Sequence, residues 1–423
     1  MHYIFSRLSQ RIHGIGVGFV TFFVFAPVLA DAGVASKLPP TVLPPTIAAD
    51  QDPTLTLFSP VHGISLPSTP AGPEDIIAKL RHGFELQYEN NHRTDAERKW
   101  YVRHQDYLTR VFTRSQRYMP YIVAELERRD LPLELALLPI VESAYDPFAY
   151  SHGRAAGLWQ MIPGTARRFG VKQNWWYDGR RDIVDSTRAA LEYLEYLEEI
   201  NDGNGLHAIA SYNSGEGNVL RAARNNRKAG KSIDFWYLRL PKETSMYVPK
   251  LLALVEIVAD PAKYGVTLPE VPDEPQFVVA DIDSQLDLAL AAELASVDVD
   301  TIYRYTPGYN RWSTDPAGPH QLVMPIDVAD TFTASLAEVP VRERVRWKRH
   351  KIGNGEAISQ IAEKYGTTVS ALRSANNLRG NTIRAGQYLM IPVATKPLSA
   401  YSQSADARLA RTQSVKRASN KLE

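Results

Sequence analysis

The chain has 423 residues, enough for two or three domains, and 44% of them are hydrophobic, so sizeable cores can form. Its 48 lysines and arginines almost balance 47 aspartates and glutamates, which argues against the strongly basic field of a nucleic-acid-binding protein. The absence of cysteine excludes disulfides, thiolate zinc sites and thiol catalysis.

The N-terminus predicts a secretory signal peptide over residues 1–30. Arg7 and Arg11 precede an apolar stretch over 15–29, and small residues stand at the −3 and −1 positions of a cleavage site after Ala30. An uncleaved membrane anchor is the alternative, although the stretch is short for a span. We therefore expect a periplasmic protein, and without a cysteine to acylate we expect no lipid anchor.

A proline-rich stretch over 31–73 has few charges and predicts an extended linker. From Glu74 the pattern becomes helical, and 75–130 predicts several helices. Tyr118, Ile122 and neighbouring apolar residues form a stripe of helical spacing, so we expect their rings in the core rather than on a sugar-binding surface.

Seven consecutive apolar residues over 135–141 lead directly to Glu142. A helix that is apolar all round is buried, so this stretch predicts a buried helix. Asp130 is the expected N-cap and Pro132 suits the first turn. Pro139 predicts a kink or an early end one residue later.

Glu142 is thus expected where a buried helix reaches the surface. Desolvation raises the pKa of a carboxyl group, and a carboxyl that stays protonated near neutral pH can act as a general acid. The alternative is an ordinary helix-end carboxylate that faces water or pairs with an arginine.

Further helices are expected after Glu142, as far as residue 258. Their ranges are 165–169, ended by Gly170; 182–200, capped by Asp182 or Asp185; 205–212; and 243–258, followed by a connector over 260–276.

Four short motifs occur in order along this part of the chain. They are Glu142-Ser143, Gly157-Leu158-Trp159-Gln160, Ser211-Tyr212-Asn213 and Glu243-Thr244-x-x-Tyr247-Val248. Together with NWWYDGRRDI at 174–183, they resemble lytic transglycosylases with a goose-type lysozyme fold, of the membrane-bound lytic murein transglycosylase D type. The resemblance covers 74–268 and implies a mainly α lysozyme-like (SLT) catalytic domain.

The resemblance also implies a mechanism. Glu142 would protonate the bond between N-acetylmuramic acid and N-acetylglucosamine and then, as a base, assist formation of a 1,6-anhydro end. Substrate-binding roles fall to Ser143, Gln160, Tyr212, Asn213 and Tyr247. No cofactor is implied, and the scattered histidines show no metal-binding motif.

A second carboxylate would be needed to activate water in an ordinary glycosidase. The candidates considered lack the apolar context of Glu142, which fits a one-carboxylate mechanism; they are Asp146, Asp178, Asp182, Asp185 and Glu216.

The C-terminal third predicts one or two small strand–helix–helix–strand modules. Residues 345–394, with Gly366 ending the first helix and Thr368 capping the second, resemble a LysM module, a fold that binds N-acetylglucosamine-containing glycans. In place of the usual Gly-Asp-Thr-Leu it has Gly355-Glu356-Ala357-Ile358, which puts glycan affinity in doubt.

An internal repeat lies upstream, because 292–305 aligns without gaps on 362–375, and 322–326 matches 389–393. We therefore expect a diverged LysM-like module over 277–327, with an unrelated linker domain as the alternative.

The polar tail over 395–423 is expected to be disordered. The predicted partner is the peptidoglycan glycan strand, bound by a monomer, without nucleic acid. Two alternatives to a lytic transglycosylase remain at this point: a hydrolytic muramidase and a non-catalytic wall-binding scaffold.

Overall fold

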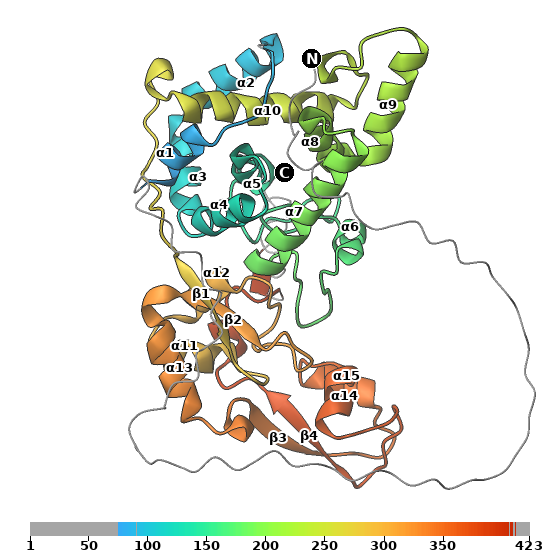
Figure 1. The fold of residues 1–423 in the computed structure, drawn as a ribbon. Helices are drawn as coiled ribbons and strands as arrows, with labels where there is room; N and C mark the ends of the chain where they lie inside the picture. The colour runs from blue at the N-terminus through green and yellow to red at the C-terminus, as the bar shows by residue number, and fades with distance from the viewer. Residues whose placement is uncertain (1–74, 90, 406, 409–410, 412–423) are drawn as a thin grey trace, which may run out of the picture.

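The computed structural model describes residues 75–89, 91–405, 407–408 and 411 (Figure 1). The predicted signal peptide, the proline-rich linker and the last part of the tail lie outside these residues. No helix among the described residues combines the length and the apolar character needed to cross a membrane.

The part of the chain covered by the resemblance, 75–268 among the described residues, is called the catalytic block below. It is a bundle of helices around one apolar core (Figure 1). The helices are α1 (Ile76–His82), α2 (His92–Arg103), α3 (Gln105–Ser115), α4 (Met119–Arg128), α5 (Leu138–Ser143), α6 (Pro163–Arg168), α7 (Ile183–Ile200), α8 (Gly205–Ser214), α9 (Glu216–Lys228) and α10 (Lys242–Ala259). Short 3₁₀ helices span Leu133–Leu137, Phe235–Tyr237 and Ala262–Tyr264.

The helix starts and ends follow local chemistry. The Asp182 carboxylate accepts hydrogen bonds from the backbone N–H groups of Val184 and Asp185 and so caps α7, as predicted. Gly170 adopts a left-handed backbone after α6. Tyr118 is fully buried, which confirms that its ring belongs to the core.

The buried stretch before Glu142 differs from its predicted form. It is divided into the 3₁₀ helix Leu133–Leu137 and the short helix α5, and Pro139 stands in the first turn of α5 rather than at its end. A proline costs no hydrogen bond there, because the N–H groups of the first turn have no acceptor within the helix. The prediction of Asp130 as N-cap is also wrong, since Pro132 holds the cap position of the 3₁₀ helix without a side-chain hydrogen bond.

Two small modules follow the catalytic block. The first contains β1 (Phe277–Asp281), α11 (Leu288–Leu294), α12 (Val299–Tyr305) and β2 (Gln321–Pro325), with β1 and β2 paired antiparallel. This is the strand–helix–helix–strand order expected for 277–327. The 3₁₀ helix Ile326–Val328, α13 (Ala329–Ala337) and the 3₁₀ helix Val341–Glu343 lead on to the second module.

The second module has the same order. Its elements are β3 (Arg346–Lys351), α14 (Ile358–Lys364), α15 (Val369–Ala375) and β4 (Tyr388–Val393), and β3 pairs antiparallel with β4. The Thr368 hydroxyl caps α15 as predicted. Ile361, Leu372 and Ile391 are among the residues of its separate small core.

The first module is attached to the catalytic block through the loop between α12 and β2. The Asp178 N–H donates to the Gly308 carbonyl at 2.8 Å, and the Asn310 N–H donates to the Trp176 carbonyl at 2.7 Å. The NWWYDGRRDI motif therefore serves as the docking seam for this module.

The start of the tail is ordered, contrary to the prediction for 395–423. A 3₁₀ helix spans Leu398–Ala400, and the Tyr401 ring is buried. The Tyr401 hydroxyl donates to the buried Asp287 carboxylate, which also accepts from the Thr395 N–H at 2.9 Å. One aromatic ring with a buried acceptor is enough to order a segment whose composition is polar.

Candidate active site

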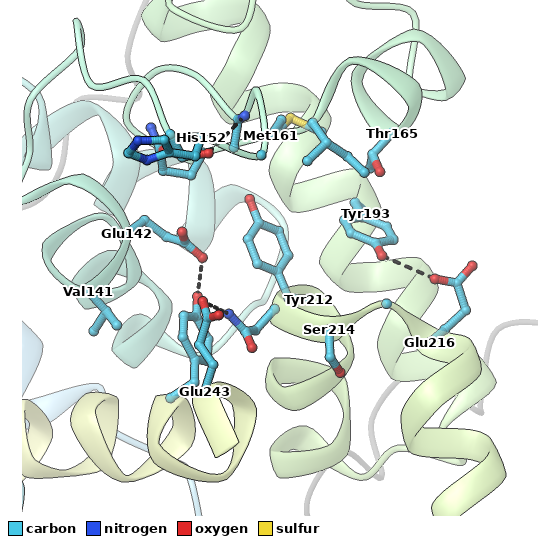
Figure 2. Close-up of a pocket in the computed structure, with 18 of the residues that line it drawn as sticks. Val141, Glu142, His152, Met161, Thr165, Tyr193, Tyr212, Ser214, Glu216 and Glu243 are labelled. Atoms are coloured by element: carbon cyan, nitrogen blue, oxygen red, sulfur yellow. Dashed lines mark hydrogen bonds between the residues drawn. The ribbon is translucent and has the colours of Figure 1, made fainter. Parts of the chain in front are cut away.

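A cavity of about 780 Å³ opens between the C-terminal ends of α5 and α8, the first turns of α10 and the loop that precedes α6 (Figure 2). Its lining includes Glu142 and four of the five predicted substrate-binding residues. The main polar residues around it are Glu142, Ser151, His152, Gln160, Thr165, Tyr193, Tyr212, Asn213, Ser214, Glu216, Glu243, Tyr247 and Lys250.

Glu142 is half-buried in the last turn of α5 and points into this cavity (Figure 2). The helix ends immediately afterwards, because Ala144 and Tyr145 both adopt left-handed backbones, with φ of 51° and 56°. Such conformations cost energy in residues other than glycine. The Tyr145 hydroxyl, which donates to the Ala136 carbonyl at 2.7 Å, helps to hold this turn.

The environment of Glu142 favours its protonated form. Burial raises the pKa of this carboxyl to about 7, and the negative charge of Glu243 acts in the same direction. The Tyr247 hydroxyl donates to Glu142 Oε1 at 2.5 Å and opposes the rise. A carboxyl with these properties can give a proton at neutral pH and accept one afterwards.

Tyr212 lies beside Glu142 on the cavity wall (Figure 2). Its hydroxyl donates to the Trp159 carbonyl at 2.8 Å, and burial together with the Glu142 charge raises its pKa well above the ordinary value. Tyr212 therefore remains a neutral phenol that ties α8 to the Gly157–Gln160 turn. Trp159 is buried behind it, where its indole N–H donates to Thr187 Oγ1 at 3.0 Å.

Gln160 and Asn213 reach the cavity with part of their hydrogen-bonding capacity used. Gln160 Nε2 donates to the carbonyls of Gly157 at 2.8 Å and Ala149 at 3.2 Å. Asn213 Oδ1 accepts from Thr244 Oγ1 at 2.8 Å. Both side chains are thus fixed in orientation by the protein itself.

Ser143 does not line the cavity, which differs from the sugar contact expected for it. Its hydroxyl lies 2.9 Å from the Leu158 carbonyl and 3.1 Å from the Pro139 carbonyl, and donates toward both. A residue next to Glu142 on a helix faces another direction, so the hydroxyl fastens α5 to the Gly157–Gln160 turn.

Gly157 is required by space as well as by backbone conformation. Its φ is +81°, and a Cβ built on it would stand 1.8 Å from the Arg180 carbonyl oxygen. The Arg180 side chain is buried and binds Asp178, while its Nη1 donates to the Arg154 carbonyl at 2.5 Å and toward the Met161 carbonyl at 3.3 Å. The docking seam therefore also supports the cavity wall formed by 151–161.

Several cavity residues were not predicted as site residues. Glu243 is an exposed carboxylate whose Oε1 lies 3.5 Å from Asn213 Nδ2, and the signal for it was present because it opens the fourth motif. Glu216, which had been considered only as a second carboxylate, accepts from the Tyr193 hydroxyl at 3.2 Å and pairs with Arg168 at 3.3 Å. His152 carries no motif that would have identified it.

In the described part of the chain, no three histidine, aspartate or glutamate side chains gather in an arrangement that could hold a metal ion.

Comparison with known families agrees with this geometry. Residues 119–235 match the family described as transglycosylase SLT domain. Residues 276–341 match the LysM-like domain of lytic transglycosylase MltD, and 350–392 match the LysM domain. Fold and matches define the class of the protein: a peptidoglycan lytic transglycosylase with a mainly α, lysozyme-like domain and C-terminal LysM-type modules.

The chain belongs to the membrane-bound lytic murein transglycosylase D family. It is 37% identical over 331 residues to membrane-bound lytic murein transglycosylase D of Escherichia coli (strain K12), covering 75% of this chain and 72% of the relative. It is also 37% identical over 133 residues to membrane-bound lytic murein transglycosylase C of Glaesserella parasuis serovar 5, covering 28% of this chain and 36% of that one. A solved lytic transglycosylase Slt from Pseudomonas aeruginosa aligns with a TM-score of 0.29 and 27% identity over 36% of this chain and 25% of its own.

Proposed function

We propose that the enzyme cleaves the β-1,4 bond between N-acetylmuramic acid and N-acetylglucosamine with a single carboxyl group, Glu142, and leaves a 1,6-anhydro end. The observation that carries this proposal is the position of Glu142 in the cavity, with a pKa raised to about 7. At that pKa the same group is an effective acid and an effective base near neutral pH.

In the first step the protonated Glu142 carboxyl gives its proton to the glycosidic oxygen, and the bond from that oxygen to C1 of the muramoyl residue breaks. The substrate's own N-acetyl group stabilises the anomeric carbon. In the second step the Glu142 carboxylate takes the proton of the C6 hydroxyl, and that oxygen bonds to C1. No water is consumed, and the attack gains from being intramolecular.

Tyr247 and Tyr212 have distinct roles in this proposal. Tyr247 donates to Glu142 and stabilises its charged form between the two steps. Tyr212 holds the Gly157–Gln160 turn against α8, which keeps Gln160 at the cavity surface. Gln160 and Asn213 present amide groups for the N-acetyl or peptide-bearing parts of the substrate, whereas Ser143 acts by positioning α5.

A hydrolytic muramidase is the second candidate, and Glu243 is the observation that favours it. This carboxylate lies on the cavity close enough to raise the pKa of Glu142, so a water molecule between the two groups could be activated by Glu243. Its side chain is exposed, however, and lacks the apolar surroundings of Glu142.

Mass spectrometry of digested murein separates the two reactions, because a 1,6-anhydro product lacks the water that a hydrolytic product has gained. We expect anhydro ends from the wild type, and no cleavage by Glu142→Gln, which keeps the size of the side chain. Glu243→Gln is the matched control and should still give anhydro ends. Reducing ends that disappear in Glu243→Gln would establish hydrolysis instead.

We further propose that the protein acts in the periplasm after removal of a signal peptide. The support is the arrangement of Arg7, Arg11 and the apolar stretch over 15–29 before Ala30. Mass analysis of the protein recovered from the periplasm should show a chain beginning at Asp31, and an intact N-terminus would show a retained anchor.

A further inference from the structure

The second module carries an unusual charge. Residues 346–393 contain eight lysines and arginines and only two glutamates, although the whole chain is almost balanced at 48 against 47. Glu356, one of these two acids, is occupied, because it accepts from His350 Nε2 at 2.9 Å and from the Gly353 N–H at 2.8 Å. The module as a whole is therefore strongly cationic.

Two of the four cations of β3, Arg349 and Lys351, share one face of the β3–β4 strand pair with several large apolar side chains, while Arg346 and Lys348 lie on the other face. Antiparallel partners project on the same side, and the register pairs Arg349 with Met390 and Lys351 with Tyr388. Trp347 lies two residues before Arg349 and projects with it. We call this set the outer face; its residues are Trp347, Arg349, Lys351, Tyr388 and Met390.

The outer face is exposed to solvent, while buried residues on the opposite face of the strand pair pack in the core that α14 and α15 share. Trp347, Tyr388 and Met390 are 42%, 50% and 41% exposed, whereas Leu389 and Ile391 are buried in the core of the module. An exposed cluster of this kind usually marks an interaction surface.

The charge of the outer face indicates an anionic partner. Neither strand carries an aspartate or glutamate. N-acetylglucosamine is neutral and would gain nothing from these cations. The Arg349 guanidinium also lies 3.7 Å from the centre of the Tyr388 ring, so a cation already covers a side of the ring on which a sugar could stack.

We propose that the outer face docks the enzyme on an anionic lipid surface. The residues of the outer face project on the same side of the strand pair, so they can contact a bilayer surface together. Tryptophan, tyrosine and methionine can enter the headgroup region while arginine and lysine contact lipid phosphates. This inference is independent of the catalytic mechanism proposed above.

The placement of the outer face leaves the cavity accessible. Figure 1 shows the paired strands β3 and β4 at the end of the molecule opposite to α8, α9 and α10, which border the cavity. A protein docked through β3–β4 would hold its catalytic domain away from the lipid plane, toward the peptidoglycan.

Vesicle co-sedimentation tests the proposal. The protein and its variants begin at Asp31, so that the apolar stretch over 15–29 contributes to none of them, and keep every described residue. The probes are vesicles of phosphatidylcholine alone and with about one third phosphatidylglycerol. We expect binding to the anionic vesicles only, weakened by salt and reduced about tenfold or more by Arg349→Gln with Lys351→Gln.

Matched variants distinguish the outer face from general charge. Arg373→Gln with Arg379→Gln removes two cations from the helical side of the same module and should reduce binding much less. Trp347→Ser with Tyr388→Ser removes no charge yet should also reduce binding about tenfold. Lysis of soluble murein fragments should be unchanged in all three, which shows that the protein is folded.

Three results would overturn the proposal. The protein could fail to bind anionic vesicles, or the two charge variants could lose binding equally. The outer-face variants could also lose binding to purified murein and keep binding to vesicles. The last result would identify the outer face as a wall-binding surface that recognises the carboxylates of the peptide stems.

Discussion

At the scale of single residues, the raised pKa of Glu142 makes activity depend on pH in a defined direction. The first step needs the protonated carboxyl, so kcat/KM should be constant in mild acid and fall as pH rises above about 7. Glu243→Gln removes a negative neighbour and should move this fall to lower pH. Tyr247→Phe removes a donor to the carboxylate and should move it to higher pH. Rate profiles on soluble glycan strands would show both shifts, and shifts of equal sign would contradict the assignment.

The same pKa has a consequence for stability. A carboxyl whose pKa is higher in the folded than in the unfolded chain costs no stability when both states are protonated, below about pH 4. As pH rises toward 7, the unfolded state releases its proton first, so the folded state loses stability. Glu142→Gln should therefore be more stable than the wild type at about pH 8, by about 1–3 kcal/mol after allowance for partial exposure, and equal to it at about pH 4.

Thermal unfolding of both proteins at these two pH values tests this prediction. A stabilisation that is the same at both pH values would mean that Gln improves the packing and that the charge of Glu142 is not responsible.

The sequence was most informative about this residue and less so about its neighbours. The run of apolar residues before Glu142 indicated a desolvated carboxyl, and the motifs that follow it favoured this interpretation over an ordinary helix-end carboxylate. The sequence could not show that the Ser143 hydroxyl fastens α5 to the Gly157–Gln160 turn, since its acceptor, the Leu158 carbonyl, lies 15 residues further along the chain. The effect of Glu243 on the pKa of Glu142 depends on how α10 approaches α5, which no local sequence pattern predicts.

At the scale of elements, the turn from Gly157 to Gln160 is held by contact with the seam that follows it. Gly157→Ala should be strongly destabilising, by about 3 kcal/mol or more, because its Cβ would overlap the Arg180 carbonyl. Gly215 is a matched control with the same φ of +81° and no atom within 4 Å of a Cβ. Gly215→Ala should cost only the backbone strain of φ 81° with ψ 142°, about 1–3 kcal/mol, and less than Gly157→Ala. Urea unfolding of the two variants would contradict this explanation if they lost equal stability.

Arg180 extends the same support to the cavity wall. Arg180→Gln leaves the buried Asp178 carboxylate with only its longer ion pair to Arg181 at 3.8 Å and releases the carbonyls of Arg154 and Met161. We therefore expect a loss of about 3–5 kcal/mol and a raised KM. Asp178→Asn with Arg180→Gln removes the uncompensated charge and should recover part of the stability but not the KM. Recovery of both would show that Arg180 has no role in positioning the wall.

Element order along the chain was largely predictable, because helical periodicity and caps are local signals. The second strand–helix–helix–strand module followed from this kind of signal, and the first from its internal repeat with the second. The ordered segment around Tyr401 did not, since it depends on the Asp287 carboxylate more than a hundred residues away. The early end predicted at Pro139 was wrong for a related reason: whether a proline starts or ends a helix depends on where the preceding turn begins.

At the scale of the whole molecule, the modules form a continuous series of contacts. The first module is bound to the catalytic block through the α12–β2 loop. The buried Asp287 of this module accepts from Thr395 and Tyr401, which follow β4. The second module, with the outer face proposed above to dock on lipid, is therefore held at a defined position relative to the cavity.

This rigidity can be tested at Asp315, a buried carboxylate in the α12–β2 loop. It pairs with Lys172 at 2.8 Å and accepts from Asn174 Nδ2 at 2.5 Å, both in the catalytic block. Asp315→Ala removes a buried acceptor and the partner of Lys172, whose side chain is 35% exposed, so it should cost about 1–3 kcal/mol and increase the radius of gyration in small-angle X-ray scattering. Glu195→Ala removes the exposed partner of Arg129, which keeps its ion pair with Glu125, and should cost about 1 kcal/mol or less and leave the radius unchanged.

Activity should separate the two variants as well. Soluble glycan strands reach the cavity by diffusion, so Asp315→Ala should cleave them nearly as the wild type does at a temperature where it is folded. Intact murein sacculi are large and fixed, and cleavage there depends on a module that holds the wall at a set distance from Glu142. Asp315→Ala should therefore lose several-fold more activity on sacculi than on soluble strands. Equal losses on both substrates would mean that the seam stabilises the fold without setting the position of the modules.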